Sequence, residues 1–284
     1  MQILIAVNIG EVGETAVSTG SKQAVSTSSN QAVAWGNLLA QFTGATPTLM
    51  TVVKHESAQR QARTFLENVT DTMTAGPVPP FIRLVVGRAA EDIVRVAKAG
   101  NYDLLVVGSR PFPSLIKRFL GSVPERILQQ APCPVFIAKN HPDSLCRILI
   151  CEGGREPSLL ERFIAKLPNL IQDGTEIKIL HVMSQILADP AGTGWELQAD
   201  AQTLIEQRAP EGELLQGDAR RLGTAPVPVF TEIRHGLVVD EIVAEAKNGR
   251  YDLIVIGRHQ GSNWWLADLM EQIVAQADRS VLVV

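Results

Sequence analysis

The sequence contains few cysteines and few aromatic residues. Its 284 residues include only Cys133, Cys146 and Cys151. Three well-separated cysteines do not make a disulfide framework, and they lack the close pairing of a zinc cluster. Aromatic residues make up 5% of the chain and hydrophobic residues 45%, so the core must consist mostly of Val, Ile, Leu and Ala. Such cysteine usage indicates a reducing, cytoplasmic compartment.

The chain also lacks an excess of positive charge and a long apolar segment. Lys and Arg total 26 against 30 Asp and Glu, which gives a formal net charge of -4. This balance argues against a general binder of nucleic acids or anionic membranes. No apolar run approaches the roughly 18 residues needed to cross a bilayer. The opening MQILIAVN has neither a basic region nor a long apolar region, so it predicts a strand rather than a signal peptide.

The sequence repeats itself once. Residues 101–108 read NYDLLVVG and residues 250–257 read RYDLIVIG, at an offset of 251 − 102 = 149. Shorter matches lie upstream and downstream in the same order, such as ILI at 3–5 and 148–150. A period this long indicates two copies of one domain rather than a solenoid. We therefore predict domains at residues 1–140 and 145–284, with a polar, turn-forming boundary between them.

Within each copy, apolar runs of strand length alternate with segments of helical period. In the first copy the predicted strands are Ile3–Val7, Thr48–Val53, Ile82–Val85, Leu104–Val107 and Val135–Ala138. The predicted helices are Gln31–Phe42, Ala58–Met73, Glu91–Ala99 and Val123–Gln130. Continuous Val, Ile and Leu runs are typical of parallel strands buried on both faces. The sequence therefore predicts an α/β fold of two doubly wound, Rossmann-like domains, each with about five parallel strands flanked by helices.

Two segments break the symmetry between the copies. Residues 11–30 are rich in Ser, Thr and Gly without an apolar period, and we expect a mobile loop there. In the second copy, prolines and glycines are spread between Pro210 and Pro228. They predict a long, loose connection.

In a doubly wound sheet, ligands bind beyond the carboxyl ends of the strands, where the strand order reverses. In the first copy, the loop after the fourth strand begins at Gly108, carries Arg110, Lys117 and Arg118, and ends at Ser122 before a helix. Glycine lets backbone approach a ligand, and free N–H groups at a helix start can hold phosphate. The basic residues could neutralise phosphates, although a solvated basic loop is the commoner case. Ser122 could equally serve only as an N-cap.

Several runs in and around this loop carry a family resemblance. They are ILIAVN at 3–8, VGRAAEDIVRVAKAG at 86–100, DLLVVGSR at 103–110 and GSVPERILQQAPCPVFIA at 121–138. Together they resemble the universal stress protein family, and more weakly the second copy does too. The resemblance covers nearly the whole chain as two tandem copies. It implies pairing of the two halves through their last strands, Val135–Ala138 and Val281–Val284, as an intramolecular pseudo-dimer, with a homodimer as a further possibility.

Members of that family that bind ATP carry a pattern of Gly, two residues, Gly, nine residues, Gly and then Ser or Thr, with an aspartate just after the first strand. Here Pro111 replaces the second glycine and Asn8 the aspartate. Pro111 removes a backbone N–H, and Asn8 brings no charge. The resemblance still implies that ATP or another adenine nucleotide binds the first copy. The implied binding residues are Val7, Asn8, Val52, Gly108, Ser109, Arg110, Gly121, Ser122 and Val123.

The second copy departs further from the pattern. Gly153 stands at the position of Asn8, and one of two registers places Asp268 at the position of Ser122 while the other places Glu271 there. A carboxylate near a phosphate subsite is electrostatically unfavourable. If one copy binds nucleotide, we expect it to be the first.

Three functions stay open from the sequence. The first is a tandem universal stress protein, a cytoplasmic regulatory module without catalytic residues, metal, nucleic-acid or membrane partners. The second is a slow nucleotide hydrolase in which Ser122 and the basic loop hold phosphates, for which no convincing general base or metal ligand can be named. The third is an interaction scaffold without a ligand.

Overall fold

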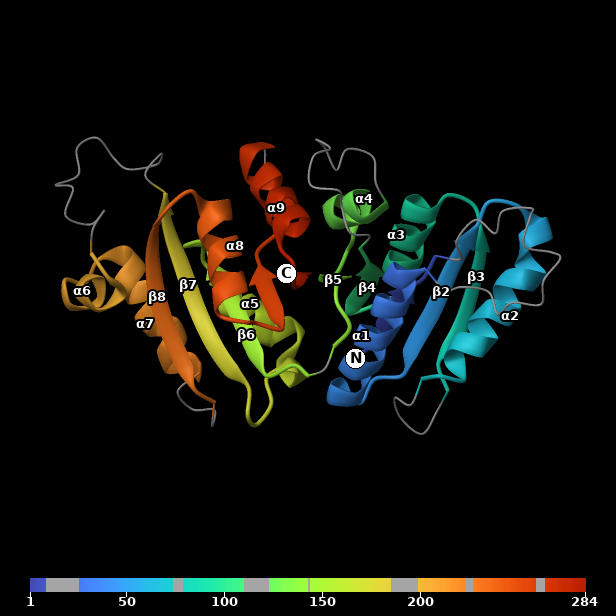
Figure 1. Ribbon diagram of the computed structural model, residues 1–284, viewed down its shortest axis with the longest axis horizontal. Coiled ribbons are helices and arrows are strands. Elements are labelled where there is room, and N and C mark those ends of the chain that lie inside the picture. The colour runs from blue at the N-terminus through green and yellow to red at the C-terminus, as the bar shows by residue number, and fades with distance from the viewer. Residues whose placement is uncertain are drawn as a thin grey trace. The chain divides into compact units, whose positions relative to one another are not determined.

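The computed structural model describes residues 1–8, 26–73, 79–109, 123–142, 144–184, 199–222, 227–258 and 264–284. The chain divides into two compact units, residues 1–142 and 143–284, which we call unit 1 and unit 2. Each unit is an α/β domain with a parallel sheet flanked by helices, as Figure 1 shows.

Unit 1 has a sheet of parallel strands in the order β3-β2-β1-β4-β5. The strands are β1 (Ile3–Ala6), β2 (Pro47–Val53), β3 (Phe81–Val86), β4 (Leu104–Gly108) and β5 (Val135–Ala138). All residues of β1 are buried, because helices cover both faces of the central strands. The strand order reverses between β1 and β4, which is where this fold class binds its ligands.

The helices of unit 1 cross over between these strands. They are α1 (Thr27–Thr43), a short 3₁₀ helix at Glu56–Ala58, α2 (Gln59–Thr70), α3 (Ala89–Ala99) and α4 (Val123–Gln130). In α2 the buried residues Ala62, Phe65, Leu66 and Val69 have the i, i+3, i+4, i+7 spacing of one helix face. Right-handed crossovers place α1 and α2 on one face of the sheet and α3 and α4 on the other.

Unit 2 repeats this arrangement, with strand order β10-β9-β6-β7-β8. Its strands are β6 (Arg147–Glu152), β7 (Glu176–Ser184), β8 (Val229–Gly236), β9 (Leu253–Ile256) and β10 (Ser280–Val283). Its helices are α5 (Leu159–Lys166), a 3₁₀ helix at Pro168–Leu170, α6 (Ala201–Glu206), α7 (Pro210–Leu222), α8 (Val238–Asn248) and α9 (Trp264–Gln276).

The repeat extends to backbone detail. Asn101 and Arg250, at the offset of 149, both have positive φ, at 49° and 52°. The N–H of Gln2 donates to the Asp103 carboxylate at 2.7 Å, and the N–H of Arg147 donates to the Asp252 carboxylate at 2.9 Å. Equivalent positions of the two units can therefore be compared directly.

The structure corrects the predicted loop at residues 11–30. Residues 27–30 belong to the first turn of α1, so this helix begins four residues before the predicted start at Gln31. Ser26 is its N-cap, and the Ser26 side chain accepts a hydrogen bond from the Ser29 N–H. The serines of this segment show no apolar period because they form the N-cap and the first turn of α1. A serine oxygen at the N-cap satisfies a free N–H group at the start of a helix. The earlier part, residues 9–25, lies outside the described residues.

The predicted loose connection from Pro210 to Pro228 was wrong over residues 210–222, which form α7, while residues 223–226 lie outside the described residues. Pro210 is the first residue of this helix, where the missing N–H has no intrahelical partner to lose. Gly212 lies against α6, and a Cβ added there would come within 2.3 Å of the Leu204 carbonyl carbon. The proline therefore starts the helix, and the glycine permits its close contact with α6.

Candidate functional site

The carboxyl edge of the unit 1 sheet brings together residues that are distant in the sequence. Val7 and Asn8 directly follow β1, Gly108 ends β4, and Ser109 comes next. Because β1 and β4 are neighbouring parallel strands, their carboxyl ends meet at the point where the strand order reverses. Four of the predicted binding residues thus lie at one position in the fold.

Side chains from the start of α1 and from β2 contact the backbone at this edge. The Ser29 hydroxyl donates to the Asn8 carbonyl oxygen at 2.8 Å, and the Asn8 N–H donates to the Ser29 Oγ at 2.9 Å. The Thr51 hydroxyl of β2 donates to the Val7 carbonyl oxygen at 2.9 Å. These bonds hold the backbone after β1 in one conformation and surround it with uncharged hydroxyl groups.

Gly108 has a packing role at this edge. A Cβ added to Gly108 would lie 1.8 Å from the carbonyl oxygen of Ser28. No other residue type lets the first turn of α1 approach the end of β4 so closely. The glycine is therefore required by the fold itself, independently of any ligand.

Asn8 is exposed at the same edge. Its backbone N–H and carbonyl are both bonded to Ser29, whereas its side-chain amide forms no hydrogen bond with the described part of the chain. An amide offers two donors and an acceptor. The uncharged side-chain amide of Asn8 is thus available for hydrogen bonds with a polar ligand.

The remaining predicted residues of unit 1 divide into two groups. Val52 is half-buried near the carboxyl end of β2, and Val123 is the exposed first residue of α4. Arg110, Gly121 and Ser122 lie outside the described residues. Sequence reasoning missed the hydroxyls of Ser28, Ser29 and Thr51 at this edge. For the two serines, the signal was available in the serine run before an apolar helical period, which is typical of a helix start.

The equivalent edge of unit 2 is filled by a carboxylate. Glu152, at the position of Val7, is 4% exposed. Its Oε1 accepts hydrogen bonds from the N–H groups of Gly153 and Gly154 at 2.9 and 3.1 Å. Its Oε2 accepts one from the Leu159 N–H, at the start of α5, at 2.7 Å. The negative charge therefore takes the N–H groups that an anionic ligand would otherwise use.

A guanidinium lies at the same edge of unit 2. Arg162 of α5 packs against Gly257, where an added Cβ would lie 2.9 Å from Arg162 Nη2. Its Nη1 donates to the Val284 carbonyl oxygen at 3.3 Å, and its Nε is buried without a hydrogen-bond partner among the described residues. Burial lowers the pKa of Arg162, and the charge of Glu152 opposes that shift. Two charged side chains therefore lie at this edge of unit 2.

Helix α9 is the counterpart of α4. The two helices end at Gln276 and Gln130, an offset of 276 − 130 = 146, and α9 includes the residues from Trp264 onward. Asp268, which that offset aligns with Ser122, lies inside α9 rather than before its first turn.

Unit 2 also buries a second carboxylate behind this edge. Asp218 of α7 is fully buried, and the hydroxyl of Ser158, the N-cap of α5, donates to its Oδ1 at 2.7 Å. Its Oδ2 has no hydrogen-bond partner within the described ranges. Burial raises the pKa of Asp218 to about 6, although the Ser158 hydrogen bond acts in the opposite direction.

Among the described residues, no helix is both long and apolar enough to cross a membrane. No group of three or more His, Cys, Asp or Glu residues in that part of the chain is placed to hold a metal ion.

A parallel α/β fold with a polar edge at its switch point defines a class of ligand-binding domains. The sequence model of the universal stress protein family matches residues 24–139 and 154–284, and the chain therefore belongs to that family as a tandem pair of its domains. A universal stress protein of Thermus aquaticus is 38% identical over 56 residues, which are 20% of this chain and 41% of that relative. The chain matches only about a third to a half of the length of such curated relatives.

Solved structures show the same fold. A universal stress protein from Archaeoglobus fulgidus aligns over 99% of this chain and 97% of its own, with a TM-score of 0.64 and 17% identity. A universal stress protein family protein from Arabidopsis thaliana with AMP bound covers 49% of this chain and 90% of its own, with a TM-score of 0.36 and 19% identity.

Proposed function

We propose that this protein is a stress-response regulatory module that binds an adenine nucleotide, ATP or a related compound, in unit 1 and not in unit 2. The observation that carries the proposal is the contrast between the two carboxyl edges. In unit 1, Asn8 is exposed beside the hydroxyl groups of Ser29 and Thr51. The equivalent edge of unit 2 holds the charged side chains of Glu152 and Arg162. At the end of the first strand, a polyanionic ligand would meet the Glu152 carboxylate in unit 2 and the uncharged Val7 in unit 1.

The residues of unit 1 suit the two ends of a nucleotide. The Asn8 amide can donate to and accept from the base or the ribose. The first N–H groups of α4, which begins at Val123, can hold phosphate oxygens. The sequence supplies Arg110 ahead of that helix for the phosphate charge, and Gly121 and Ser122 directly before it. Pro111 removes one backbone donor, so we expect weaker binding than an intact glycine pattern would support.

The proposal is tested by calorimetric titration of the intact protein with ATP, ADP and AMP. Asn8→Ala removes the amide and is expected to weaken binding about fivefold, as one lost hydrogen bond of about 1 kcal/mol implies. Gly153→Ala is the matched control in unit 2, because a Cβ there meets no atom within 4 Å. It is expected to leave the affinity unchanged. Binding that responds to Gly153→Ala and not to Asn8→Ala would contradict the assignment to unit 1.

The same titration separates the alternatives. Absence of binding at millimolar nucleotide would favour the ligand-free scaffold. Release of phosphate above background with Mg²⁺ or Mn²⁺ would favour the slow hydrolase instead. Two family segments in one chain supply both partners of a pseudo-dimer, and light scattering at the mass of one chain would support that arrangement over a homodimer.

A further inference from the structure

A pocket of about 590 Å³ lies at the other edge of the unit 1 sheet, where the strands begin. Its lining includes Gln2 before β1, Thr48 in β2, Phe81 and Arg83 in β3, and Tyr102 before β4. The carboxyl edge with Asn8 and Gly108 lies at the opposite ends of the same strands. The pocket is thus separate from the proposed nucleotide site.

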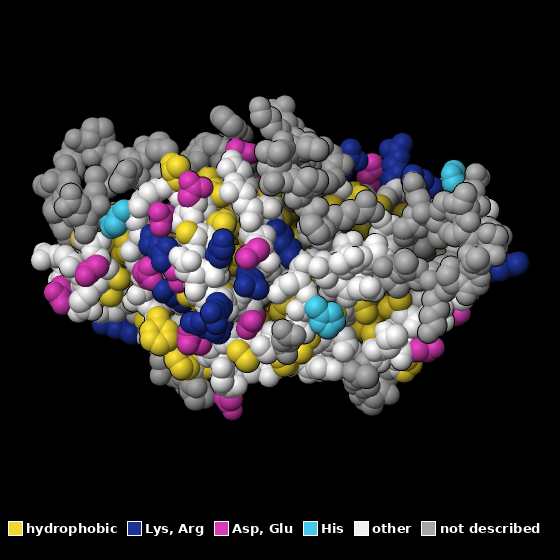
Figure 2. All heavy atoms as spheres, viewed as in Figure 1, with side chains coloured by type: hydrophobic (Ala, Val, Ile, Leu, Met, Phe, Trp, Pro, Cys, Tyr) yellow, Lys and Arg dark blue, Asp and Glu magenta, His cyan; other side chains and the backbone are white. Residues whose placement is uncertain are grey.

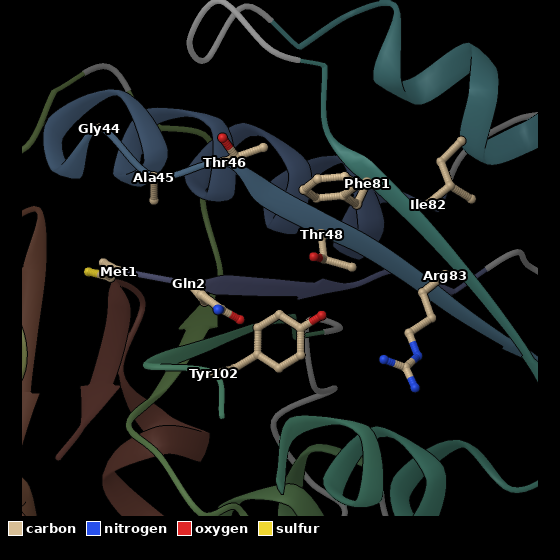
Figure 3. A pocket seen from close by; sticks show the side chains of 10 residues that line it. All are labelled: Met1, Gln2, Gly44, Ala45, Thr46, Thr48, Phe81, Ile82, Arg83 and Tyr102. Atoms are coloured by element: carbon tan, nitrogen blue, oxygen red, sulfur yellow. The ribbon is translucent and has the colours of Figure 1, made fainter. Parts of the chain in front are cut away.

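Polar groups face this pocket without partners. Figure 3 shows the side chains of Thr48, Arg83 and Tyr102 extending into the same space. Within the described residues, Arg83 forms no ion pair and neither the Thr48 nor the Tyr102 hydroxyl forms a hydrogen bond. Phe81 is 62% exposed at the rim. The pocket therefore combines one cation, two hydroxyl groups and an exposed aromatic ring.

The equivalent positions of unit 2 hold a network of charged side chains. The offset of 149 and the strand register pair Thr48 with Lys178, Arg83 with Glu232, Val96 with Glu245, and Tyr102 with Tyr251. Figure 2 shows basic and acidic side chains gathered over β7, β8 and α8 in unit 2.

A carboxylate lies at the centre of that network. Glu245 is 3% exposed, and the Tyr251 hydroxyl donates to its Oε1 at 2.7 Å. Lys178 Nζ donates to the same oxygen at 2.9 Å, and Arg234 also pairs with Glu245. In unit 2, the polar groups at this edge therefore bind the Glu245 carboxylate, which is held by a phenol hydroxyl and two cations.

Unit 1 keeps the phenol but not the carboxylate. Val96 stands in place of Glu245 and is 1% exposed, so the Tyr102 hydroxyl lacks the acceptor that Tyr251 has. Arg83 is the one charged side chain among the described lining residues, and it can pair with one carboxylate. Phe81 and the neighbouring Ile82 offer apolar surface beside it.

We propose that this pocket binds a small organic monocarboxylate with an aromatic or branched apolar group. Arg83 and the Tyr102 hydroxyl take the carboxylate, with Thr48 as a further donor, and Phe81 and Ile82 contact the apolar group. The Tyr102 contact corresponds to the contact of Tyr251 with Glu245 in unit 2. The cation comes from a different position, because Arg83 stands where unit 2 has Glu232.

The probe for the test is 4-fluorophenylacetate, titrated into the intact ¹⁵N-labelled protein and followed by ¹⁹F and amide NMR. We expect a dissociation constant on the order of 1 mM, with amide shifts confined to the start of β1, β2, β3 and β4. Arg83→Gln removes a charge-assisted bond and is expected to weaken binding about tenfold. Tyr102→Phe is expected to weaken it about fivefold.

Two controls keep the result decisive. Arg60→Gln makes the same charge change on α2, at an exposed arginine outside the pocket, and is expected to leave the affinity unchanged. The neutral 4-fluorophenylacetamide is expected to bind at least about fivefold more weakly. Equal binding of the amide, equal effects of Arg60→Gln and Arg83→Gln, tighter binding of inorganic phosphate, or no shifts at this edge would each overturn the proposal. Saturating ATP is expected not to displace the probe, so this site and the nucleotide site can fail separately.

Discussion

Val7 and Glu152 occupy equivalent positions at the end of the first strand of each unit, and only Glu152 carries a charge. Val7 is buried and leaves Asn8 to face outward. Glu152 turns its carboxylate onto three backbone N–H groups of its own unit. Charge-assisted bonds of this kind are about twice as strong as neutral ones. In unit 2 the Glu152 carboxylate thus binds backbone N–H groups of its own unit.

Asp218 predicts a pH dependence in the stability of unit 2. Its pKa is about 6 in the folded state, against an ordinary value of 3.8. Between these two values the folded state holds more protons than the unfolded state. The free energy of unfolding therefore decreases as the pH rises through this window, and levels off above the folded pKa. The contribution is on the order of 3 kcal/mol.

The measurement is urea unfolding of the intact protein and of Asp218→Asn at several pH values across this window. We expect a flatter profile for the variant, since its amide does not titrate. Asp173→Asn, in an exposed turn, is the matched control and should keep the native profile. Parallel profiles for native protein and Asp218→Asn would contradict the raised pKa.

Among the helices, α7 offers a comparison within one element. Gly212 faces the backbone of Leu204 in α6, whereas a Cβ on Gly217 would meet only the Arg221 side chain at 3.5 Å. We expect Gly212→Ala to destabilise unit 2 by about 2 kcal/mol or more, because backbone atoms must move apart. Gly217→Ala is expected to stabilise it by up to about 1 kcal/mol, since alanine is the better helix former. Thermal unfolding of the two variants checks the prediction, and equal effects would show that the contact of α6 and α7 is not as close as described.

Strands were predicted correctly from the sequence where their residues form a continuous apolar run. The strands β1 to β5 lie where their Val, Ile and Leu runs predicted them, within a residue or so. Strands buried on both faces, such as β1, tolerate little else, and the partly exposed edge strand β3 also carries an apolar run. The start of α1 and the whole of α7 escaped prediction. Serine and proline mark both loops and helix starts, so their presence alone does not distinguish the two.

At the scale of the whole molecule, the proposed function makes the two units respond differently to one ligand. Saturating ATP stabilises only the unit that binds it, by RT ln(1 + [L]/Kd). In hydrogen exchange followed by mass spectrometry, we expect slower exchange around β1, α1 and β4. Peptides from β6, α5 and β9 are expected to exchange at the same rate with and without ATP. Protection of the unit 2 peptides would contradict the view that Glu152 and Arg162 exclude the nucleotide.

The sequence alone determined the duplication, the parallel α/β class, the resemblance to universal stress proteins and the departures at Asn8 and Pro111. These are properties of pattern and residue type, which a chain carries whether folded or not. Only the tertiary structure decided what lies at each edge of each sheet. The approach of Ser28 to Gly108, the burial of Glu152 against α5 and the opening beside Arg83 and Tyr102 each join segments far apart in sequence. Such contacts depend on how strands and helices pack, and no local pattern specifies them.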